Sequence, residues 1–429
     1  MVVLKNIFEI KMQRKNVMSS GKKHVIVVGG GASGMMAAIS AKRQGADVTI
    51  FERNARIGKK ILATGNGRCN FTNINTDISY YHGNNPKFAN NALSQFGVND
   101  TIAFFEKIGI AHKVEELGKV FPMSDQASSV LDVLLYEIKQ NDVNIVCNAY
   151  VKNIINNNGM FTVKLEDGSA YTANSVIIAT GGKAMPSTGS DGNGFELARA
   201  LGHSVTDIFP GLVQLMLEGK FFKQIDGVKI VGTAEILSNK QCLAKDRGDV
   251  LFTNYGVSGP PVLQISRKAG ELLQENKEAI LKITVIDTID KHELTHLIAA
   301  RFNNNPQKTV EFGMVGLINK RLIPVVLKEA GIEDLKHIAL NVSPAQCEAI
   351  AQKLTDWRFT IRGTKGWQSA QVTAGGIDTQ EVYDDTMQSK IVKGLFFAGE
   401  IMDIDGQCGG FNLQWAWSSG FVAGYNAAQ

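Results

Sequence analysis

The chain has 429 residues, of which 44% are hydrophobic and 20% are charged. This length exceeds what one hydrophobic core usually supports, and the composition is that of a globular protein, so we expect two domains or one domain with a large insertion. No segment approaches the roughly 18 consecutive apolar residues of a membrane span, so no membrane-spanning segment is expected.

The net charge of +4 is concentrated at the start of the chain, because residues 1–23 carry six Lys and Arg against Glu9 alone. The remainder is close to neutral, and we therefore predict no nucleic-acid partner. Lys5 and Glu9 interrupt the apolar stretches of this basic extension, which disfavours a signal peptide. Two interpretations stay open. It is either a frayed extension or a start placed upstream of Met18, or it is a weak membrane or partner helix built on Leu4, Ile7, Phe8 and Met12.

The cysteines are odd in number, scattered and without C-x-x-C spacing, which indicates a reducing compartment and predicts a cytoplasmic protein. They are Cys69, Cys147, Cys242, Cys347 and Cys408.

The first predicted elements form a βαβ unit. Val25 to Val28 is a short apolar run typical of a buried parallel strand, a helix is predicted from Ser33 to Gln44, and a second strand from Asp47 to Phe51. Gly45 ends the helix in a left-handed cap. Together these elements predict a dinucleotide-binding unit.

Gly29, Gly31 and Gly34 stand at G-x-G-x-x-G spacing between the first strand and the helix. The first glycine permits the tight turn, the second lets the backbone approach a pyrophosphate, and the third lets the helix pack on the strand. Glu52 follows the second strand, where a carboxylate can accept hydrogen bonds from the ribose hydroxyls of adenosine. The agreement of these signals predicts a bound dinucleotide, with the pyrophosphate at the helix N-terminus.

A loop rich in glycine and asparagine follows from Ile57 to Asn73, and then alternating helices and strands. Helices are predicted at 86–97, 99–109 and 128–140, and consecutive strands at 144–147, 150–155, 160–166 and 169–173, with Asn-Gly and Asp-Gly turns between the later strands. A buried strand at 175–179 leads into Thr180, Gly181 and Gly182.

The pattern changes near residue 200 to short strands with turn signals, which suggests an antiparallel sheet or small barrel. We predict strands at 213–217, 229–237, 249–252, 282–286, 359–362 and 368–372, and helices at 291–302, 314–330 and 344–357.

The last segment returns to a buried strand, Gly394 to Ala398, a glycine loop and a helix, Asn412 to Asn426. The predicted fold class is therefore α/β: a Rossmann-like nucleotide-binding domain with a parallel sheet and a β-meander, interrupted by an inserted β-barrel plus helical subdomain. The expected boundaries are 1–23 for the basic extension, 24–199 and 366–429 for the nucleotide-binding domain, and 200–365 for the insertion.

Glu400 follows the strand in this closing segment, where a carboxylate can accept a hydrogen bond from a polyol chain while Gly399 allows a close approach. Gly409 and Gly410 precede the final helix, whose N-terminus, aimed at a flavin ring, would stabilise negative charge on the reduced ring.

His292, Glu293 and His296 match the H-E-x-x-H motif of zinc proteases. Both histidines project away from the predicted buried stripe of the helix, no third ligand follows at the required spacing, and Asp290 with Glu293 fits an N-cap pair. We therefore predict no metal site.

Several blocks resemble the glutathione-reductase-type flavoproteins, and within them a bacterial family of NAD(P)/FAD-dependent oxidoreductases. The blocks are GGGASGMMAA at 29–38, GKKILATGNGRCNFTN at 58–73, ATGG at 179–182, STGSDGNGFELARALGH at 187–203, FTNYGVSGP at 252–260, TAGGI at 373–377 and GLFFAGEIMDIDGQCGGFNLQWAWSSG at 394–420. Relatives in this family are known as aminoacetone oxidases or 3-dehydro-bile-acid reductases, so the resemblance does not define the substrate.

The resemblance implies FAD as cofactor and an insertion similar to a β-barrel with a helical subdomain. It implies FAD contacts from Gly29, Gly31, Ala32, Ser33, Gly34, Glu52, Arg53, Lys60, Thr64, Gly65, Asn66, Arg68, Cys69, Asn70, Val151, Thr180, Gly181, Gly182, Gly399, Glu400, Gly409, Gly410, Phe411, Asn412 and Leu413.

Arg68 has two open interpretations: a guanidinium that holds a carboxylate substrate or an anionic flavin, or a surface or phosphate contact. Cys69 and Cys408 are interpreted as two separate thiols rather than a redox pair, because they lack C-x-x-C spacing.

The function predicted is an FAD-dependent oxidoreductase that transfers hydride between a small organic substrate and flavin N5. No second G-x-G-x-x-G follows a strand, so NAD(P)H is expected as a transient co-substrate that docks between the domains. Alternatives are an oxidase of a small amine that uses oxygen, and, from another class, a flavin-bound redox sensor or RNA-modification flavoprotein. The sequence does not assign a catalytic acid or base, or an oligomeric state.

Overall fold

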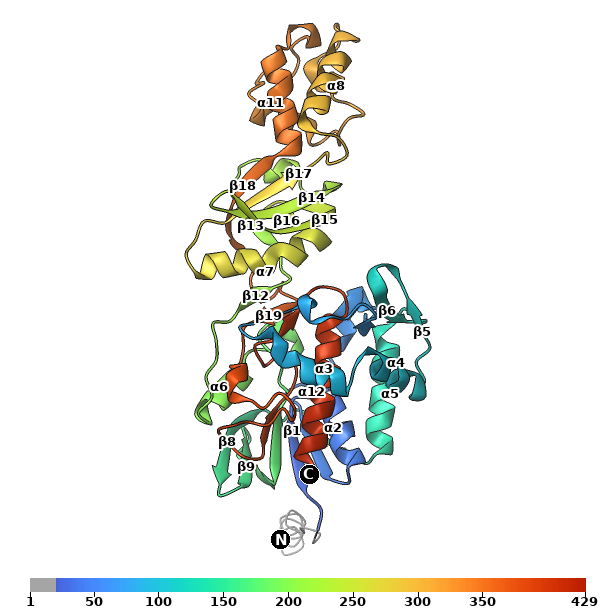
Figure 1. Cartoon of the computed structure of the whole chain (residues 1–429), viewed down its shortest axis with the longest axis vertical. Coiled ribbons are helices and arrows are strands. Elements are labelled where there is room, and N and C mark those ends of the chain that lie inside the picture. The colour runs from blue at the N-terminus through green and yellow to red at the C-terminus, as the bar shows by residue number, and fades with distance from the viewer. Residues whose placement is uncertain (1–20) are drawn as a thin grey trace, which may run out of the picture.

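The computed structural model describes residues 21–429. The predictions made for residues 1–20 therefore lie outside the described residues. Figure 1 shows an elongated molecule with a large α/β lobe, a barrel beyond it and a helical tip beyond the barrel. The first elements after residue 20 and the C-terminal segment belong to the α/β lobe, while the middle of the chain forms the barrel and the tip.

The centre of the α/β lobe is a five-stranded sheet of order β20-β11-β1-β2-β7, parallel throughout. Val25 of β1 pairs with Ser175 of β11 on one side and with Val48 of β2 on the other. The strands are β1 His24–Val28, β2 Asp47–Phe51, β7 Asn144–Val146, β11 Ser175–Ile178 and β20 Leu395–Phe397. Because β20 comes from the end of the chain, the sheet joins the two ends of the sequence, which confirms the predicted Rossmann-type fold.

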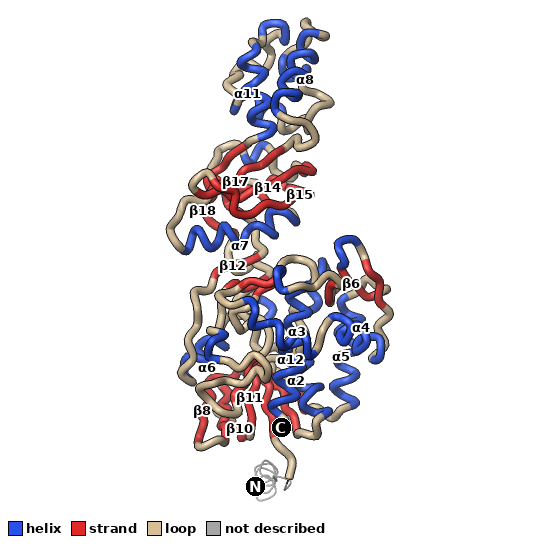
Figure 2. Tube along the Cα trace, viewed as in Figure 1, coloured by secondary structure: helices blue, strands red, loops and turns tan. Residues whose placement is uncertain are grey.

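Two helices cover one face of this sheet side by side, α2 Ala32–Arg43 and α12 Phe411–Ala427 (Figure 2). They approach so closely that glycine is required at the contact. A Cβ atom on Gly420 would lie 2.4 Å from the carbonyl oxygen of Ser33, and one on Gly424 would lie 2.1 Å from that of Ala37. The absence of side chains at these two positions therefore holds the last helix against the first.

We predict that Gly424→Ala destabilises the protein, although alanine is usually the better helix former by about 0.5 to 1 kcal/mol. The added methyl would meet backbone that cannot move, and the expected loss is roughly 1 to 3 kcal/mol of unfolding free energy, measured by urea denaturation. Gly363→Ala is the control, because nothing lies within 4 Å of its Cβ position. A Gly424→Ala protein as stable as the parent would contradict this packing.

The predicted strand at 144–147 lies in the central sheet rather than with the strands that follow it. Helix α5 Ala127–Gln140 precedes β7 and returns the chain so that Ile145 and Val146 pair parallel with Ile50 and Phe51. The meander therefore contains three antiparallel strands, β8 Val151–Asn157, β9 Met160–Leu165 and β10 Ala170–Ala173.

Smaller elements complete the lobe. The sheet β3-β6-β5 and the pair β21-β4 lie close to the start of α12. These elements are β3 Thr72–Asn73, β4 Tyr81–His82, β5 His112–Val114, β6 Lys119–Pro122, β21 Asp405–Gly406, α3 Ala89–Gln95, α4 Val98–Lys107 and α6 Asn193–Ala200, with short 3-10 turns at Ile61–Gly67, Ile78–Tyr80, Pro86–Phe88, Glu116–Gly118, Pro186–Thr188 and Thr379–Glu381.

The middle of the chain forms a closed barrel of order β13-β16-β15-β14-β17-β18. Its strands are β13 Leu215–Leu217, β14 Lys229–Ser238, β15 Gln241–Thr253, β16 Gly256–Ser258, β17 Ile280–Thr284 and β18 Trp357–Thr364. The barrel shares a hydrophobic core with the tip, separate from that of the α/β lobe.

Helix α7, Pro260–Gln274, runs beside the barrel and is absent from the sequence predictions. Gly259, Pro260 and Pro261 suggested the end of a structured segment, but the structure places Gly259 at the N-cap and the prolines in the first turn. Proline is tolerated there because the first helical N-H groups have no partner within the helix.

The helical tip contains α8 Lys291–Asn303, α9 Val310–Gly313, α10 Ile323–Glu329 and α11 Pro344–Thr355, with a 3-10 turn at Ala339–Asn341. The single helix predicted at 314–330 is wrong. Gly316 has a left-handed φ of +87°, which interrupts the helix, and Pro324 stands in the first turn of a new one.

A two-stranded ribbon connects the lobe to the barrel, with β12 Phe209–Gly211 antiparallel to β19 Val372–Ala374. The strand predicted at 368–372 is instead observed at 372–374, so it begins four residues later. Within residues 21–429, the structure contains no helix long and apolar enough to cross a bilayer.

Candidate functional site

The three glycines of the G-x-G-x-x-G turn after β1 have different structural roles. A Cβ atom on Gly29 would lie 2.6 Å from the carbonyl oxygen of Ala179, and one on Gly34 would lie 1.9 Å from that of Gly29. A Cβ on Gly31 would meet nothing within 4 Å. Gly29 and Gly34 are therefore required by the fold, whereas Gly31 leaves open space beside the N-terminus of α2.

That open space belongs to a cleft of about 1140 Å³, including its open mouth, at the carboxyl ends of the parallel strands. Ligands of open α/β sheets bind at this edge. The predicted cofactor residues that line it come from both ends of the chain: Gly29, Gly31, Ala32, Ser33, Glu52, Arg53, Lys60, Thr64, Val151, Thr180, Gly181, Glu400, Asn412 and Leu413.

Glu52 stands at the end of β2 with a side chain that is almost fully buried. Its Oε2 accepts a hydrogen bond from the Gly30 N-H at 3.0 Å, and its Oε1 accepts one from the Asn54 N-H at 2.8 Å. Oε1 also accepts a hydrogen bond from Asn54 Nδ2 at 2.6 Å. These bonds hold the carboxylate at the cleft wall, and Oε2 keeps lone-pair capacity for a further donor.

Lys60 and Glu400 form an ion pair across the cleft wall, with Nζ 2.8 Å from Oε2. The other carboxylate oxygen of Glu400 accepts a hydrogen bond from the Thr373 N-H at 2.7 Å. The pair thus joins the loop after β2 to the loop after β20, and both charges are largely withdrawn from water.

The start of α12 forms the remaining wall. Gly410 is the N-cap with φ +102°, and a Cβ there would lie 2.4 Å from the carbonyl oxygen of Thr72. Asn70 Oδ1 lies nearby, buried and without a hydrogen-bond partner in the described structure. The lining residues here are Asn412, Leu413, Trp415 and Ala416, and Gly410 and Asn70 lie behind them.

Eleven predicted residues do not line the cleft. Gly182 and Gly399 are direct chain neighbours of the lining residues Gly181 and Glu400. Both are closely packed, since a Cβ on them would lie 2.2 Å from Thr373 Oγ1 and 2.5 Å from Ser33 Oγ. The full set is Gly34, Gly65, Asn66, Arg68, Cys69, Asn70, Gly182, Gly399, Gly409, Gly410 and Phe411.

Arg68 points away from the cleft toward the β5-β6 hairpin. Its Nε donates to Asp125 Oδ1 at 2.8 Å, it pairs with Glu115, and the guanidinium lies 4.0 Å from the ring centroid of Phe121. The hydrogen bonds that Arg68 donates to Glu115 and Asp125 raise its pKa. Of the two interpretations, this geometry favours the surface contact.

Cys69 and Cys408 are both free thiols in the described structure. Cys69 is fully buried, and burial raises its pKa to about 12, so its thiolate is scarce at neutral pH. Cys408 is exposed.

The cleft also contains residues that the sequence predictions did not assign. Gly30 is the middle glycine of the turn, and Thr188 to Asn193 belongs to a block already quoted for the resemblance, so both carried a signal. The unassigned lining residues are Val28, Gly30, Phe51, Asn54, Gly58, Lys59, Ile61, Ala149, Tyr150, Ala179, Thr188, Gly189, Ser190, Asn193, Gln371, Val372, Trp415 and Ala416.

The H-E-x-x-H motif lies on α8 at the tip, far along the molecule from the cleft (Figure 1). Asp290 accepts a hydrogen bond from the Glu293 N-H at 2.8 Å, which confirms the predicted N-cap. Among residues 21–429, no group of three His, Cys, Asp or Glu side chains is placed to hold a metal ion.

Comparison with known proteins defines the family. Residues 23–426 match the family described as HI0933-like protein Rossmann domain. The chain belongs to this HI0933-like family. It is therefore an FAD-dependent oxidoreductase, and the predicted family, enzyme class and flavin cofactor are confirmed at this level.

Three characterised proteins are similar to nearly the whole chain. A protein of Clostridium scindens named 3-dehydro-bile acid delta(4,6)-reductase is 40% identical over 94% of this chain and 98% of its own. Two proteins named ribosomal RNA dihydrouridine synthase, from Escherichia coli and Haemophilus influenzae, are 33% and 30% identical, each over 92% of this chain and 96% of its own.

We predict that Gly31→Val abolishes FAD binding without unfolding the protein, because its side chain would enter open cleft space and strain nothing.

Glu52→Ala should weaken FAD binding by roughly 1.5 to 3 kcal/mol, the usual value of charge-assisted hydrogen bonds. Fluorescence titration of the apoprotein with FAD measures both effects, and circular dichroism checks the fold. Parental affinity in either variant would contradict the assignment of that residue.

Acid should destabilise the protein through His82, which stands opposite Asp405 in the β4-β21 pair. Burial is the larger cause and repulsion from the Arg267 charge the smaller one, and together they lower the pKa of His82 to about 4. Between pH 6.5 and about 4 the unfolded chain binds a proton that the folded chain does not, so stability falls as pH falls, by at most about 1.4 kcal/mol per pH unit.

His82→Gln removes this titration. Urea unfolding of both apoproteins at pH 7 and pH 4.5 should show a smaller acid loss in the variant, and an equal loss in both proteins would refute the contribution of His82.

Proposed function

We propose that this enzyme reduces a carbon-carbon double bond conjugated to a carbonyl group in a small organic molecule, with NAD(P)H as electron donor. The observation that carries the proposal is the 40% identity, over almost the full length of both chains, to a reductase of a 3-dehydro bile acid. FAD, when bound, supplies the hydride exchange between donor and substrate.

The cleft residues support this function by position and charge. The N-H groups at the start of α2 face the cleft beside Gly31, where they suit a pyrophosphate. Glu52 is held at the end of β2 for the ribose hydroxyls. Lys60 and Glu400 place a fixed charge pair farther along the wall, with Glu400 available to a polyol.

The domain organisation bears on where the electron donor NAD(P)H would bind. The structure assigns the described residues between β12 and β19 to the barrel, α7 and the helical tip, and the sequence has no second G-x-G-x-x-G after a strand. NAD(P)H would therefore dock transiently between the barrel and the α/β lobe and leave after reduction.

A second candidate substrate is a uridine in RNA, whose ring also has a double bond conjugated to a carbonyl. Two relatives are named for this reaction. The charge distribution favours it as well. The barrel segments, 213–285 and 357–366, carry 13 Lys and Arg against 8 Asp and Glu, whereas 24–212 and 367–429 carry 18 against 23.

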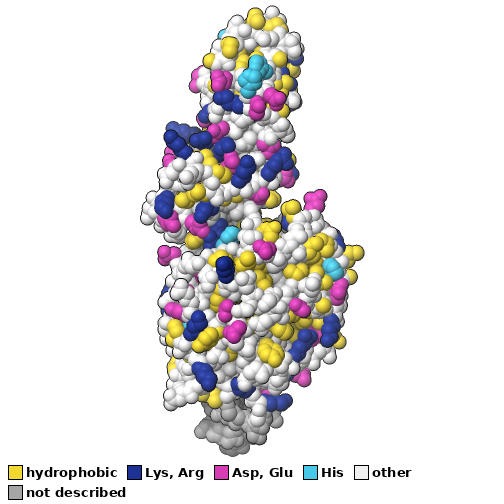
Figure 3. Space-filling view, in the orientation of Figure 1, with side chains coloured by type: hydrophobic (Ala, Val, Ile, Leu, Met, Phe, Trp, Pro, Cys, Tyr) yellow, Lys and Arg dark blue, Asp and Glu magenta, His cyan; other side chains and the backbone are white. Residues whose placement is uncertain are grey.

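Lys and Arg side chains gather over the barrel in Figure 3. We predicted no nucleic-acid partner from the near-neutral net charge of residues 24–429. That net charge averages over a basic barrel and an acidic α/β lobe. A basic barrel face suits a phosphate backbone.

We predict that NADH or NADPH bleaches the flavin absorbance rapidly in anaerobic stopped-flow mixing, and that an enone restores it faster than oxygen does. Small amines are the comparison. Bleaching by amines alone would support the oxidase alternative and overturn the proposal.

The two substrate classes separate in a parallel assay with a steroid enone and with unmodified ribosomal RNA. Substrate loss and dihydrouridine, both measured by mass spectrometry, report the two reactions. Dihydrouridine formation without turnover of the enone would replace the first candidate by the second.

A further inference from the structure

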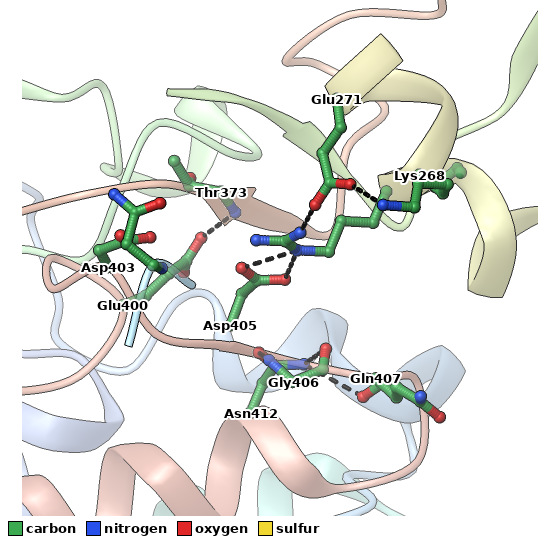
Figure 4. Close-up of polar contacts among 12 residues, drawn as sticks. Lys268, Glu271, Thr373, Glu400, Asp403, Asp405, Gly406, Gln407 and Asn412 are labelled. Atoms are coloured by element: carbon green, nitrogen blue, oxygen red, sulfur yellow. Dashed lines mark hydrogen bonds and ion pairs between the residues drawn. The ribbon is translucent and has the colours of Figure 1, made fainter. Parts of the chain in front are cut away.

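Helix α7 of the barrel contacts the loop that leads into α12. Figure 4 shows the polar network between them. The Arg267 Nε atom lies 2.9 Å from Asp405 Oδ2 and 3.1 Å from Oδ1, and the guanidinium also pairs with Glu271. An arginine of the barrel thus carries the charge that faces a carboxylate of the α/β lobe.

Asp405 depends on this partner because its side chain is only 2% exposed, and that of Arg267 only 16%. A buried carboxylate without a cation is strongly destabilising. Lys268 pairs with Glu271 at 2.6 Å at the outer end of the network, and its side chain is more exposed. The inner pair therefore defines where α7 meets the loop.

Gln264 makes a second contact one helical turn earlier. Its Oε1 accepts a hydrogen bond from the Cys408 N-H at 2.9 Å, and its Nε2 donates to Gln407 Oε1. Because residues three apart lie on the same face of a helix, Gln264 and Arg267 act on the loop together.

The loop is connected in turn to the cofactor cleft through Asn412. Asn412 Oδ1 accepts from the Gly406 N-H at 2.8 Å, and its Nδ2 donates to the Gly406 carbonyl at 2.7 Å. Asn412 lines the cleft. A Cβ on Gly406 would lie 2.8 Å from the Cβ of Phe411, so loop and first helical turn cannot shift independently.

The α/β lobe also contacts this loop from its other side. β21 pairs with β4, the Gln407 N-H donates to the Tyr80 carbonyl at 2.9 Å, and Asn73 Nδ2 donates to the Gly409 carbonyl at 2.8 Å. None of these bonds engages the Asp405 carboxylate or the Cys408 N-H, which are bonded by α7.

We propose that Gln264 and Arg267 are positioning residues that hold the 405–410 loop, and through it the N-terminal turn of α12, in the geometry that binds FAD. The barrel is thereby part of the cofactor site although neither residue lines the cleft. The proposal is independent of which substrate the enzyme reduces.

The test compares Gln264→Leu, Arg267→Met and Arg267→Lys with Lys268→Met as the control on the same helix. Full-length apoprotein is titrated with FAD, and hydrogen exchange is followed at the Gly406 and Cys408 amides. Arg267→Met and Gln264→Leu should each raise the FAD Kd about tenfold, as expected when a buried polar group loses its partner. They should also speed exchange at both amides.

Arg267→Lys should recover part of the affinity, because it restores the positive charge but not the planar guanidinium that bonds both Asp405 and Glu271. Lys268→Met should change neither measurement. If Arg267→Met fails to fold, Gln264→Leu and Asp405→Asn carry the test.

Variants that lose thermal stability but keep the parental FAD Kd and exchange rates would overturn the proposal. The contact between α7 and the loop would then only stabilise the packing of the barrel on the α/β lobe. All of these measurements need only FAD, so they are unaffected if the proposed substrate is wrong.

Discussion

The structure depends on the close approach of the last helix to the first. Gly420 and Gly424 bring α12 into backbone contact with α2, and β20 extends the parallel sheet beside β11. Because the carboxyl ends of parallel strands share one edge, this packing places the glycine turn, Glu52 and Glu400 around a single cleft. A site for one extended cofactor therefore results from the convergence of segments almost 400 residues apart in the sequence.

Local sequence signals predicted the parts of the fold in which each residue has a local steric task. Strand Asp47–Phe51 has the predicted bounds, and Gly45 has the expected left-handed conformation, with φ +92°. The first half of β15 was missed because its charged residues, such as Lys245 and Arg247, lack apolar alternation, and the strand is stabilised by pairing with β14. Helix α7 was missed because Gly-Pro-Pro serves equally as a terminator and as a helix start.

For the candidate site, too, the sequence predicted local features but not long-range contacts. Both halves of the cleft were predicted from glycine spacing and from the family resemblance, but the direction of a side chain was not. Arg68 stands in a glycine loop that borders the cleft, yet Glu115 and Asp125, about 50 residues away in the sequence, draw its guanidinium outward. Such long-range partners leave no trace in the spacing around Arg68 itself.

We infer that both ends of the chain enclose one FAD molecule. Hydrogen exchange of the apoprotein before and after addition of FAD reports on both ends at once. Backbone amides at 31–34 and at 411–415 should become protected together, at one FAD per chain. Protection of one segment without the other, or of neither, would contradict it.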